Sequence, residues 1–287
     1  MQSLLAAPGA WPADWLVPDW PAPANVRAVF TTRAGGVSAP PYDSMNLGDH
    51  VGDRLVQVQA NRALLQRATG TRVVFLKQVH GSAVLTLDSA NSDGLQADAC
   101  VTTQRRLACT VMVADCLPVL LSTEAGDVVA AAHAGWRGLA GEGSEAGGIG
   151  VLDAVYASFM ALAQAGRAQA AIKTIAWLGP CIGPSAFEVG AEVRAAFVAA
   201  QPGASRFFVA LQPDDASGRG KKSKYLADLQ GLARSRLQSL GVTQIYGNDG
   251  SAPWCTVSNP SRFFSHRRDA SSGFGATGRM AACIWLD

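Results

Sequence analysis

Three side chains in this sequence have the chemistry of a metal site. Cys116 follows the apolar run at 107–113, His133 ends the next apolar run, and His80 follows a third β-type run near 73–76. Two imidazoles and a thiolate at strand ends form the ligand set of catalytic zinc, which leaves its fourth position for water or substrate. The separations, 36 residues from His80 to Cys116 and 17 from Cys116 to His133, match no short zinc motif.

Cys116 has two other interpretations. It could act as a nucleophile with His133 as its general base, as in cysteine hydrolases, or it could be a buried structural thiol. Asp115 beside it would be a turn carboxylate or a group that orients a ligand. The residues alone leave these alternatives open.

Two further segments have binding chemistry. A glycine-rich run with Trp136 and Arg137 follows His133 and precedes a predicted helix, and free N–H groups at a helix N-terminus with an arginine nearby suit an anion. Tight turns are the alternative, because neither a Walker motif nor a dinucleotide fingerprint is present. Phe264, His266 and Arg267 could stack a planar base and neutralise an anion, or form a surface loop.

The elements that must position these residues alternate along the chain. Apolar runs typical of strands occupy 26–31, 73–87 with an interruption at His80, 99–102, 107–113, 118–122, 128–132, 175–178, 244–246 and 280–286. Helical spacing covers 55–68, 149–165, 192–200 and 226–240. This pattern predicts an α+β (mixed α/β) domain over 26–287. A Trp- and Pro-rich arm precedes it at 1–25, and a polar insertion interrupts it near 212–224.

Composition limits the partners and the compartment. A net charge of +2 argues against nucleic acid and anionic membranes as partners. Six cysteines without paired short spacings indicate a reducing compartment. The N-terminal stretch lacks a basic segment before its apolar part, and no run of ~20 apolar residues occurs. We therefore expect a soluble, cytoplasmic protein.

Several motifs then occur in the order found in one known family. They are TTRAGGVS, NLG, LKQVHG, ADC, HAGWRG, GPCIGP and FFSHRRD. From about Trp15 to the C-terminus the chain resembles the YfiH-like family, whose members are described as laccase-like polyphenol oxidases, as peptidoglycan editing factors and as purine nucleoside phosphorylases. The resemblance implies mixed β-sheets flanked by helices, related to the catalytic domain of the CNF toxin.

The resemblance also implies a site and an activity. His80, Cys116 and His133 would be the catalytic zinc ligands, with copper as the other possible metal. The substrates would be phosphate and a purine nucleoside: adenosine, inosine, guanosine or methylthioadenosine. Adenosine would also be deaminated. The candidate substrate contacts are Arg33, Asn46, Gln78, Arg137, Phe264, His266 and Arg267. Asp115 and Glu188 are candidate acid–base groups, although the sequence assigns no proton donor.

Three other functions remain as alternatives. A copper-dependent polyphenol oxidase is disfavoured, because four histidines without an HxH pair cannot ligate both a type 1 copper and a trinuclear cluster. A cysteine hydrolase acting on peptidoglycan fragments would use the Cys116–His133 pair. The third alternative is a non-enzymatic binding protein that senses nucleosides.

Overall fold

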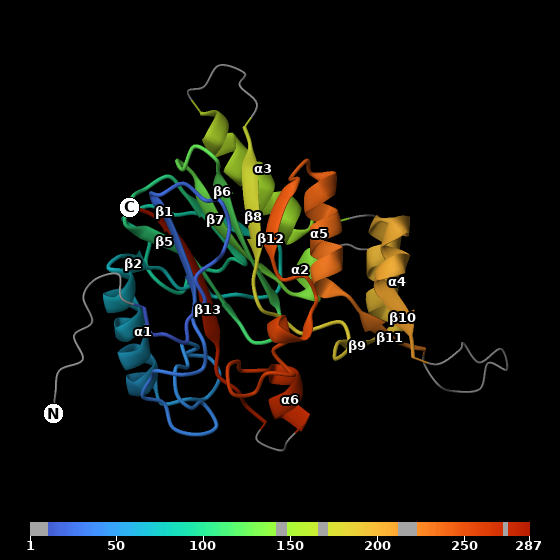
Figure 1. Cartoon of the computed structure of the whole chain (residues 1–287), viewed down its shortest axis with the longest axis horizontal. Coiled ribbons are helices and arrows are strands. Elements are labelled where there is room, and N and C mark those ends of the chain that lie inside the picture. The colour runs from blue at the N-terminus through green and yellow to red at the C-terminus, as the bar shows by residue number, and fades with distance from the viewer. Residues whose placement is uncertain (1–10, 142–147, 166–171, 212–222, 272–274) are drawn as a thin grey trace.

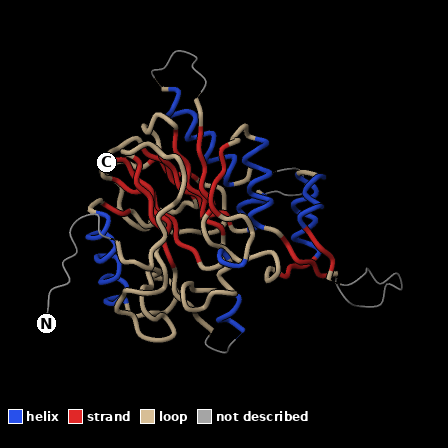
Figure 2. Tube along the Cα trace, viewed as in Figure 1, coloured by secondary structure: helices blue, strands red, loops and turns tan. Residues whose placement is uncertain are grey.

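The structure, a computed structural model, describes residues 11–141, 148–165, 172–211, 223–271 and 275–287. Figure 1 shows two large sheets packed against each other, with helices on their outer faces. Strands fill the centre of the molecule in Figure 2, and helices lie on both sides of them. The predicted mixed α/β fold is confirmed.

Each of the two large sheets mixes parallel and antiparallel neighbours, and the small third sheet is antiparallel. The four-stranded sheet has the order β1 (Val26–Phe30), β13 (Met280–Leu286), β5 (Leu107–Val113) and β2 (Arg72–Val73). The six-stranded sheet has the order β12 (Gln244–Gly247), β8 (Thr174–Leu178), β6 (Leu117–Thr123), β7 (Val129–Ala134), β4 (Ala99–Thr102) and β3 (Val84–Thr86). A three-stranded sheet has the order β10 (Phe208–Ala210), β11 (Lys224–Ala227) and β9 (Glu188–Gly190).

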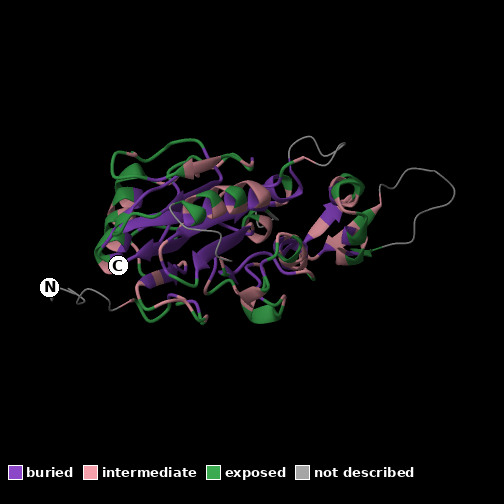
Figure 3. Ribbon diagram, turned by 90° about the horizontal axis from the view of Figure 1, so that it is seen from above, coloured by how far each residue is buried: buried purple, intermediate pink, exposed green. Residues whose placement is uncertain are grey.

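The strands of both large sheets are buried, as Figure 3 shows, and their side chains form three clusters, one of which lies between the two sheets. Side chains of a strand alternate between its two faces. In β5, Cys109 and Val111 accordingly face the six-stranded sheet, while Ala108 and Met112 pack in the cluster beneath helix α1 (Leu55–Thr69). Burial on both faces explains why every residue of this strand except Thr110 is apolar.

Helices cover the outer faces of the two sheets. Helix α1 ends at Gly70, which adopts the left-handed conformation with φ 63°. Helices α3 (Val151–Gln164) and α5 (Leu229–Ser239) pack with the six-stranded sheet. The remaining helices are α2 (Trp136–Ala140), α4 (Ala191–Ala200) and α6 (His266–Ser271), with 3₁₀ turns at Pro202–Phe207 and Ala252–Trp254.

Two predicted elements are wrong in extent. The helix expected over 226–240 begins at Leu229, because Lys224–Ala227 pairs with β9 as strand β11. The strand expected over 73–87 is two short strands, β2 and β3. Between them the chain leaves the sheets, and its backbone at 79–81 hydrogen-bonds to the Asp98 carboxylate instead.

Aromatic side chains attach the described part of the N-terminal arm to the body. Trp15 is buried, and Trp11 packs edge-on against Trp285 with ring centroids 5.7 Å apart. Leu16 pairs with Phe30 at the end of β1. Most of the polar insertion predicted near 212–224 lies outside the described residues, at 212–222, and its last residue, Lys224, begins strand β11. Most of the glycine-rich run, at 142–147, also lies outside the described residues. Among the described residues, no helix has the length and apolar character needed to cross a membrane.

Candidate metal centre and cavity

Strand register brings the cysteine and one histidine together. Leu117 pairs with Ala134 in the antiparallel β6–β7 hairpin, so Cys116 lies across from Gly135, close to His133. On its other side, β7 pairs with β4, where Ala132 lies opposite Ala99, so Asp98 lies beside His133. The His133 amide donates a hydrogen bond to the Asp98 carbonyl at 2.7 Å. The separation of 17 residues therefore reflects a hairpin, which no short motif describes.

Asp98 is the residue that holds the site together. Its carboxylate is fully buried and accepts four hydrogen bonds. Three come from consecutive backbone N–H groups: Val79 at 3.1 Å, His80 at 2.8 Å and Gly81 at 2.8 Å. The fourth comes from Nδ1 of His133 at 2.8 Å. An aspartate that receives Nδ1–H leaves the Nε2 lone pair for a metal, as in the carboxylate–histidine–metal arrangement of known sites.

The backbone is constrained on both sides of this centre. His80 and Asp115 have φ values of 64° and 89°, a region that non-glycine residues seldom occupy. Surrounding contacts fix both: the Asp98 bonds hold His80, while Asp115 accepts from the Thr256 hydroxyl and the Arg267 amide. Residues held in such conformations cluster at functional sites.

The charges of Cys116 and His133 are coupled. Burial alone would raise the pKa of the Cys116 thiol, but the positive charge and hydrogen bond of His133, together with the hydrogen bond to His80, lower that pKa to about 6. Burial would likewise lower the pKa of His133, yet Cys116 and Asp98 raise that pKa to about 9. Without a metal, the pair is therefore a thiolate and an imidazolium at neutral pH.

The donor set fits a tetrahedral metal ion. One ligand atom from each of His80, Cys116 and His133 lies within 4.8 Å of the others, and the two rings are 4.7 Å apart between centroids. Donors about 2.0–2.3 Å from zinc on a tetrahedron lie about 3.3–3.6 Å from one another, so small side-chain rotations close the site. Gly135 provides the space, because a Cβ there would lie 2.9 Å from the Cys116 sulfur.

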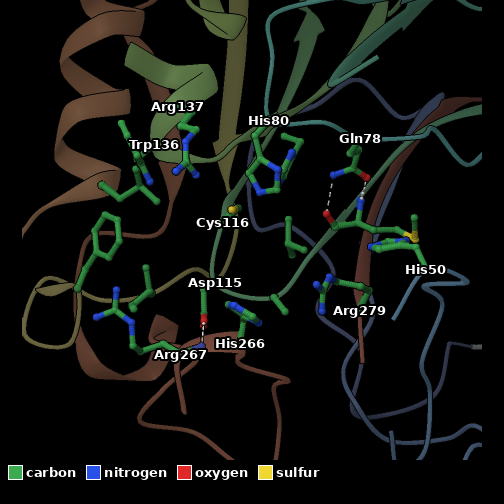
Figure 4. A pocket seen from close by; sticks show the side chains of 17 residues that line it. His50, Gln78, His80, Asp115, Cys116, Trp136, Arg137, His266, Arg267 and Arg279 are labelled. Atoms are coloured by element: carbon green, nitrogen blue, oxygen red, sulfur yellow. Dashed lines mark hydrogen bonds between the residues drawn. The ribbon is translucent and has the colours of Figure 1, made fainter. Parts of the chain in front are cut away.

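The three residues line a cavity of about 380 Å³, which is within the usual size range of small-molecule sites. All four histidines of the chain line this one cavity. Figure 4 shows Cys116 and His80 between two groups of side chains: Trp136 and Arg137 on one side, and His50, Gln78 and Arg279 on the other. The walls also include Met112, Val113, Ala114, Ile182, Phe187 and Leu229.

Four of the seven predicted substrate contacts line the cavity: Gln78, Arg137, His266 and Arg267. The Gln78 amide exchanges two hydrogen bonds with the backbone of Met112, at 2.8 and 2.7 Å, and so fixes the end of β5. The Arg267 guanidinium donates to the carbonyl of Glu188 at 2.9 Å.

The other three, Arg33, Asn46 and Phe264, do not line the cavity. Arg33 pairs with Asp43 and stacks over the buried Phe264 ring, 4.8 Å from its centroid. The buried Asn46 side chain bonds to its own loop and to the backbone of Arg279. Of the candidate acid–base groups, Asp115 lines the cavity, while Glu188 pairs with Lys224 outside it.

Sequence reasoning missed several residues of this site. Asp98 resembled an ordinary turn residue before a strand, although an aspartate that directly precedes a buried strand could have been tested as a histidine partner. His50 carried a signal as one of only four histidines. Trp136 was named only as part of the segment that contains Arg137, and Arg279 carried no signal, because its cavity-facing position follows from long-range packing.

Comparison with known proteins places the chain and its fold in a family. Residues 27–287 match the model of a family described as multi-copper polyphenol oxidoreductase laccase. The chain is 46% identical over 272 residues to a purine nucleoside phosphorylase of Pseudomonas aeruginosa, and the aligned region covers 95% of this chain and 98% of that protein. It is also 46% identical over 273 residues to the purine nucleoside phosphorylase YfiH of Escherichia coli, with 94% and 98% covered.

Two solved structures have the same fold. A Neisseria meningitidis protein aligns with a TM-score of 0.81 and 44% identity over 96% of this chain and 99% of that one. YlmD of Geobacillus stearothermophilus aligns with a TM-score of 0.69 and 28% identity over 92% of each chain. The nearly full-length family match and these relatives show that the chain belongs to the YfiH family of laccase-like proteins, as its motifs predicted.

Proposed function

We propose that the protein is a zinc-dependent purine nucleoside phosphorylase that also deaminates adenosine. One observation carries the proposal: His80, Cys116 and His133 converge in a cavity large enough for a nucleoside, with Asp98 fixing two of them. The names of the curated relatives support phosphorolysis as the reaction. The substrates would be adenosine, inosine, guanosine and methylthioadenosine.

The apolar side of the cavity suits a purine. Trp136 and Phe187 present aromatic rings, and Ile182 and Leu229 complete an apolar wall. Aromatic side chains stack on the π-face of any base, which favours binding of several purines over selection of one. The Arg137 guanidinium lies 4.6 Å from the Trp136 ring centroid and would extend this surface by stacking.

In phosphorolysis, a phosphate oxygen forms a bond to the anomeric carbon while the bond from that carbon to the base nitrogen breaks. The departing base carries the bonding electron pair and takes up a proton. Bound zinc would supply Lewis-acid stabilisation of developing negative charge. The chain's own contribution would be to orient the nucleoside against the aromatic wall and to neutralise phosphate, with His266 as a candidate contact to the base.

Deamination would use the same cavity. In that reaction water adds at the purine carbon that bears the amino group, and ammonia leaves, so no phosphate is needed. The ratio of the two activities therefore depends on phosphate concentration, which gives a simple assay. Zinc-loaded protein supplied with inosine and phosphate should release hypoxanthine and ribose 1-phosphate, and with adenosine alone it should release inosine and ammonia.

Metal content decides between zinc and copper. Two histidines and a cysteine are also ligands that copper accepts. We expect one zinc per chain and no oxidation of phenols. One copper per chain together with phenol oxidation would overturn the zinc proposal, and metal-loaded protein that releases no hypoxanthine would overturn the phosphorylase proposal.

The thiolate–imidazolium pair supports a second candidate, a cysteine hydrolase acting on peptidoglycan fragments. A low thiol pKa beside a histidine is the usual state of a cysteine nucleophile. Chelation separates the two functions. A metal enzyme loses turnover when zinc is removed and regains it with added zinc, whereas a cysteine hydrolase keeps its turnover and loses it on thiol alkylation.

A further inference from the structure

A guanidinium without an anionic partner lines the cavity on the side away from Trp136. The Nη1 atom of Arg279 donates to the backbone carbonyls of Thr277 and Gly278, at 3.0 and 3.2 Å. Within the described ranges it makes no ion pair, and burial lowers its pKa. An anion would stabilise this half-buried positive charge, whose hydrogen bonds go only to backbone carbonyls within the described residues.

The loop at 46–48 is built around this arginine. The Asn46 side chain accepts from the Arg279 amide at 2.9 Å, and the Leu47 amide donates to the Arg279 carbonyl at 3.1 Å. Gly48 leaves room for the side chain, because a Cβ there would lie 2.8 Å from the Arg279 Cγ. Three consecutive residues thus fix the backbone and the stem of a side chain whose charged end faces the cavity.

The other arginines of the cavity are placed differently. Arg137 is exposed and stacks on Trp136, so water screens its charge. Arg267 donates to the carbonyls of Ala186 and Glu188. Arg279 also donates to two backbone carbonyls, but it is more buried than Arg137, and an anion therefore gains more by pairing with Arg279 than with Arg137.

The position of Arg279 also fits the geometry of phosphorolysis. Phosphate attacks the anomeric carbon from the face opposite the base, so base and phosphate occupy opposite sides of the ribose. Figure 4 shows Trp136 on one side of Cys116 and His80, and Arg279 with His50 on the other. A purine on the aromatic wall would therefore direct the open face of its ribose toward Arg279.

We propose that Arg279 binds the phosphate co-substrate, with His50 beside it as a second donor. The inference rests on the proposed phosphorylase function and locates its phosphate. Arg279 gives up no atoms in the reaction: it holds phosphate oxygens and stabilises their charge while the new carbon–oxygen bond forms. Asn46, predicted to contact substrate, would then act through Arg279 as a positioning residue.

The test is the KM for phosphate and the KM for inosine in zinc-loaded protein. Loss of a charged hydrogen-bonding partner should raise the KM for phosphate about 10- to 100-fold in R279Q. The KM for inosine should stay within about threefold, and R279K should lie between wild type and R279Q because it keeps the charge but loses the planar pair of donors. R137Q is the matched control, and it should raise the KM for phosphate less than the KM for inosine.

Direct binding of inorganic phosphate keeps this inference separate from the phosphorylase proposal. Calorimetric titration of zinc-loaded wild type should show saturable binding that R279Q weakens by the same factor. The role of Arg279 is overturned if R279Q leaves both the KM for phosphate and the phosphate affinity unchanged. It is also overturned if only R137Q raises that KM and weakens phosphate binding. If wild type shows no phosphorolysis, the proposed function fails, and the titration still decides whether Arg279 binds phosphate. If R279Q does not fold, R279K carries the same test.

Discussion

Replacement of Asp98 by asparagine should damage the metal site more than any other single change outside the three ligands. The carboxylate accepts two hydrogen bonds at each oxygen: His80 N–H and His133 Nδ1–H at Oδ1, and the Val79 and Gly81 amides at Oδ2. Asparagine offers one oxygen and one NH₂ group. In either orientation of the asparagine amide, two of the four N–H donors face its NH₂ group instead of an oxygen and so lose their acceptor.

The cost follows from those two bonds. A hydrogen bond to a charged group contributes about 1.5–3 kcal/mol, so losing two would cost about 3–6 kcal/mol before the loop relaxes. Relaxation and the relief of burying a charge reduce this, and we expect D98N to be less stable than wild type by at least about 2 kcal/mol. Zinc affinity should fall about 10- to 100-fold, the usual effect of removing a group that orients a metal ligand.

The assay has two parts and a matched control. Urea unfolding of the metal-free proteins measures the stability, and competition with a chelating dye measures the zinc affinity. Asp88 also accepts two backbone N–H bonds, from Ala90 and Asn91, but it is exposed and remote from the cavity. D88N should therefore cost less than about 1 kcal/mol and leave zinc affinity unchanged. Wild-type zinc affinity in a folded D98N protein would refute the role assigned to Asp98.

Three other perturbations test separate parts of the structure. G135A would place a Cβ 2.9 Å from both the Cys116 sulfur and the His80 Cδ2 atom, so zinc affinity should fall about tenfold or more in chelator competition. In metal-free protein at pH 7, iodoacetamide should modify Cys116 first, because its pKa is about 6 and the five other cysteines are buried. Burial alone would raise the pKa of Asp269, but hydrogen bonds, chiefly from Thr277, hold that pKa below its ordinary value of 3.8. The ionised carboxylate therefore stabilises the fold above pH 3.8, and this stabilisation is lost as the pH falls through the lowered pKa.

Each of the three has its own control. G203A adds a Cβ where no atom lies within 4 Å, and zinc affinity should not change. Zinc-loaded protein should resist alkylation at Cys116, and mass spectrometry that found the first adduct on another cysteine would contradict the pKa order. D269N should lose less stability than wild type between pH 4 and pH 3 in urea titrations. A parallel loss in the two proteins would show that Asp269 does not titrate below its ordinary range.

The approach of Cys116 to His133 could be predicted from sequence because strand patterning and hairpin pairing are local. An apolar run that begins just after Cys116, a short turn and a second run that ends near His133 describe a hairpin, and a hairpin brings its open ends together. The helix expected over 226–240 failed at its start for a related reason. The apolar spacing of Leu226 fits a helix, but pairing of Lys224–Ala227 with β9 overrides that local preference.

The polar side of the cavity could not be predicted in this way, because its parts are far apart in the sequence. The Arg279 amide donates a hydrogen bond to the side chain of Asn46, which lies 233 positions away in the sequence and fixes the Arg279 backbone. A motif such as NLG shows that Asn46 matters but not whether it contacts substrate or supports a residue that does. The same ambiguity misplaced Arg33 and Phe264, which pack on each other beside the site. Short motifs therefore identify the residues that a site needs, and only the packing of distant segments separates those that face the ligand from those that hold them in place.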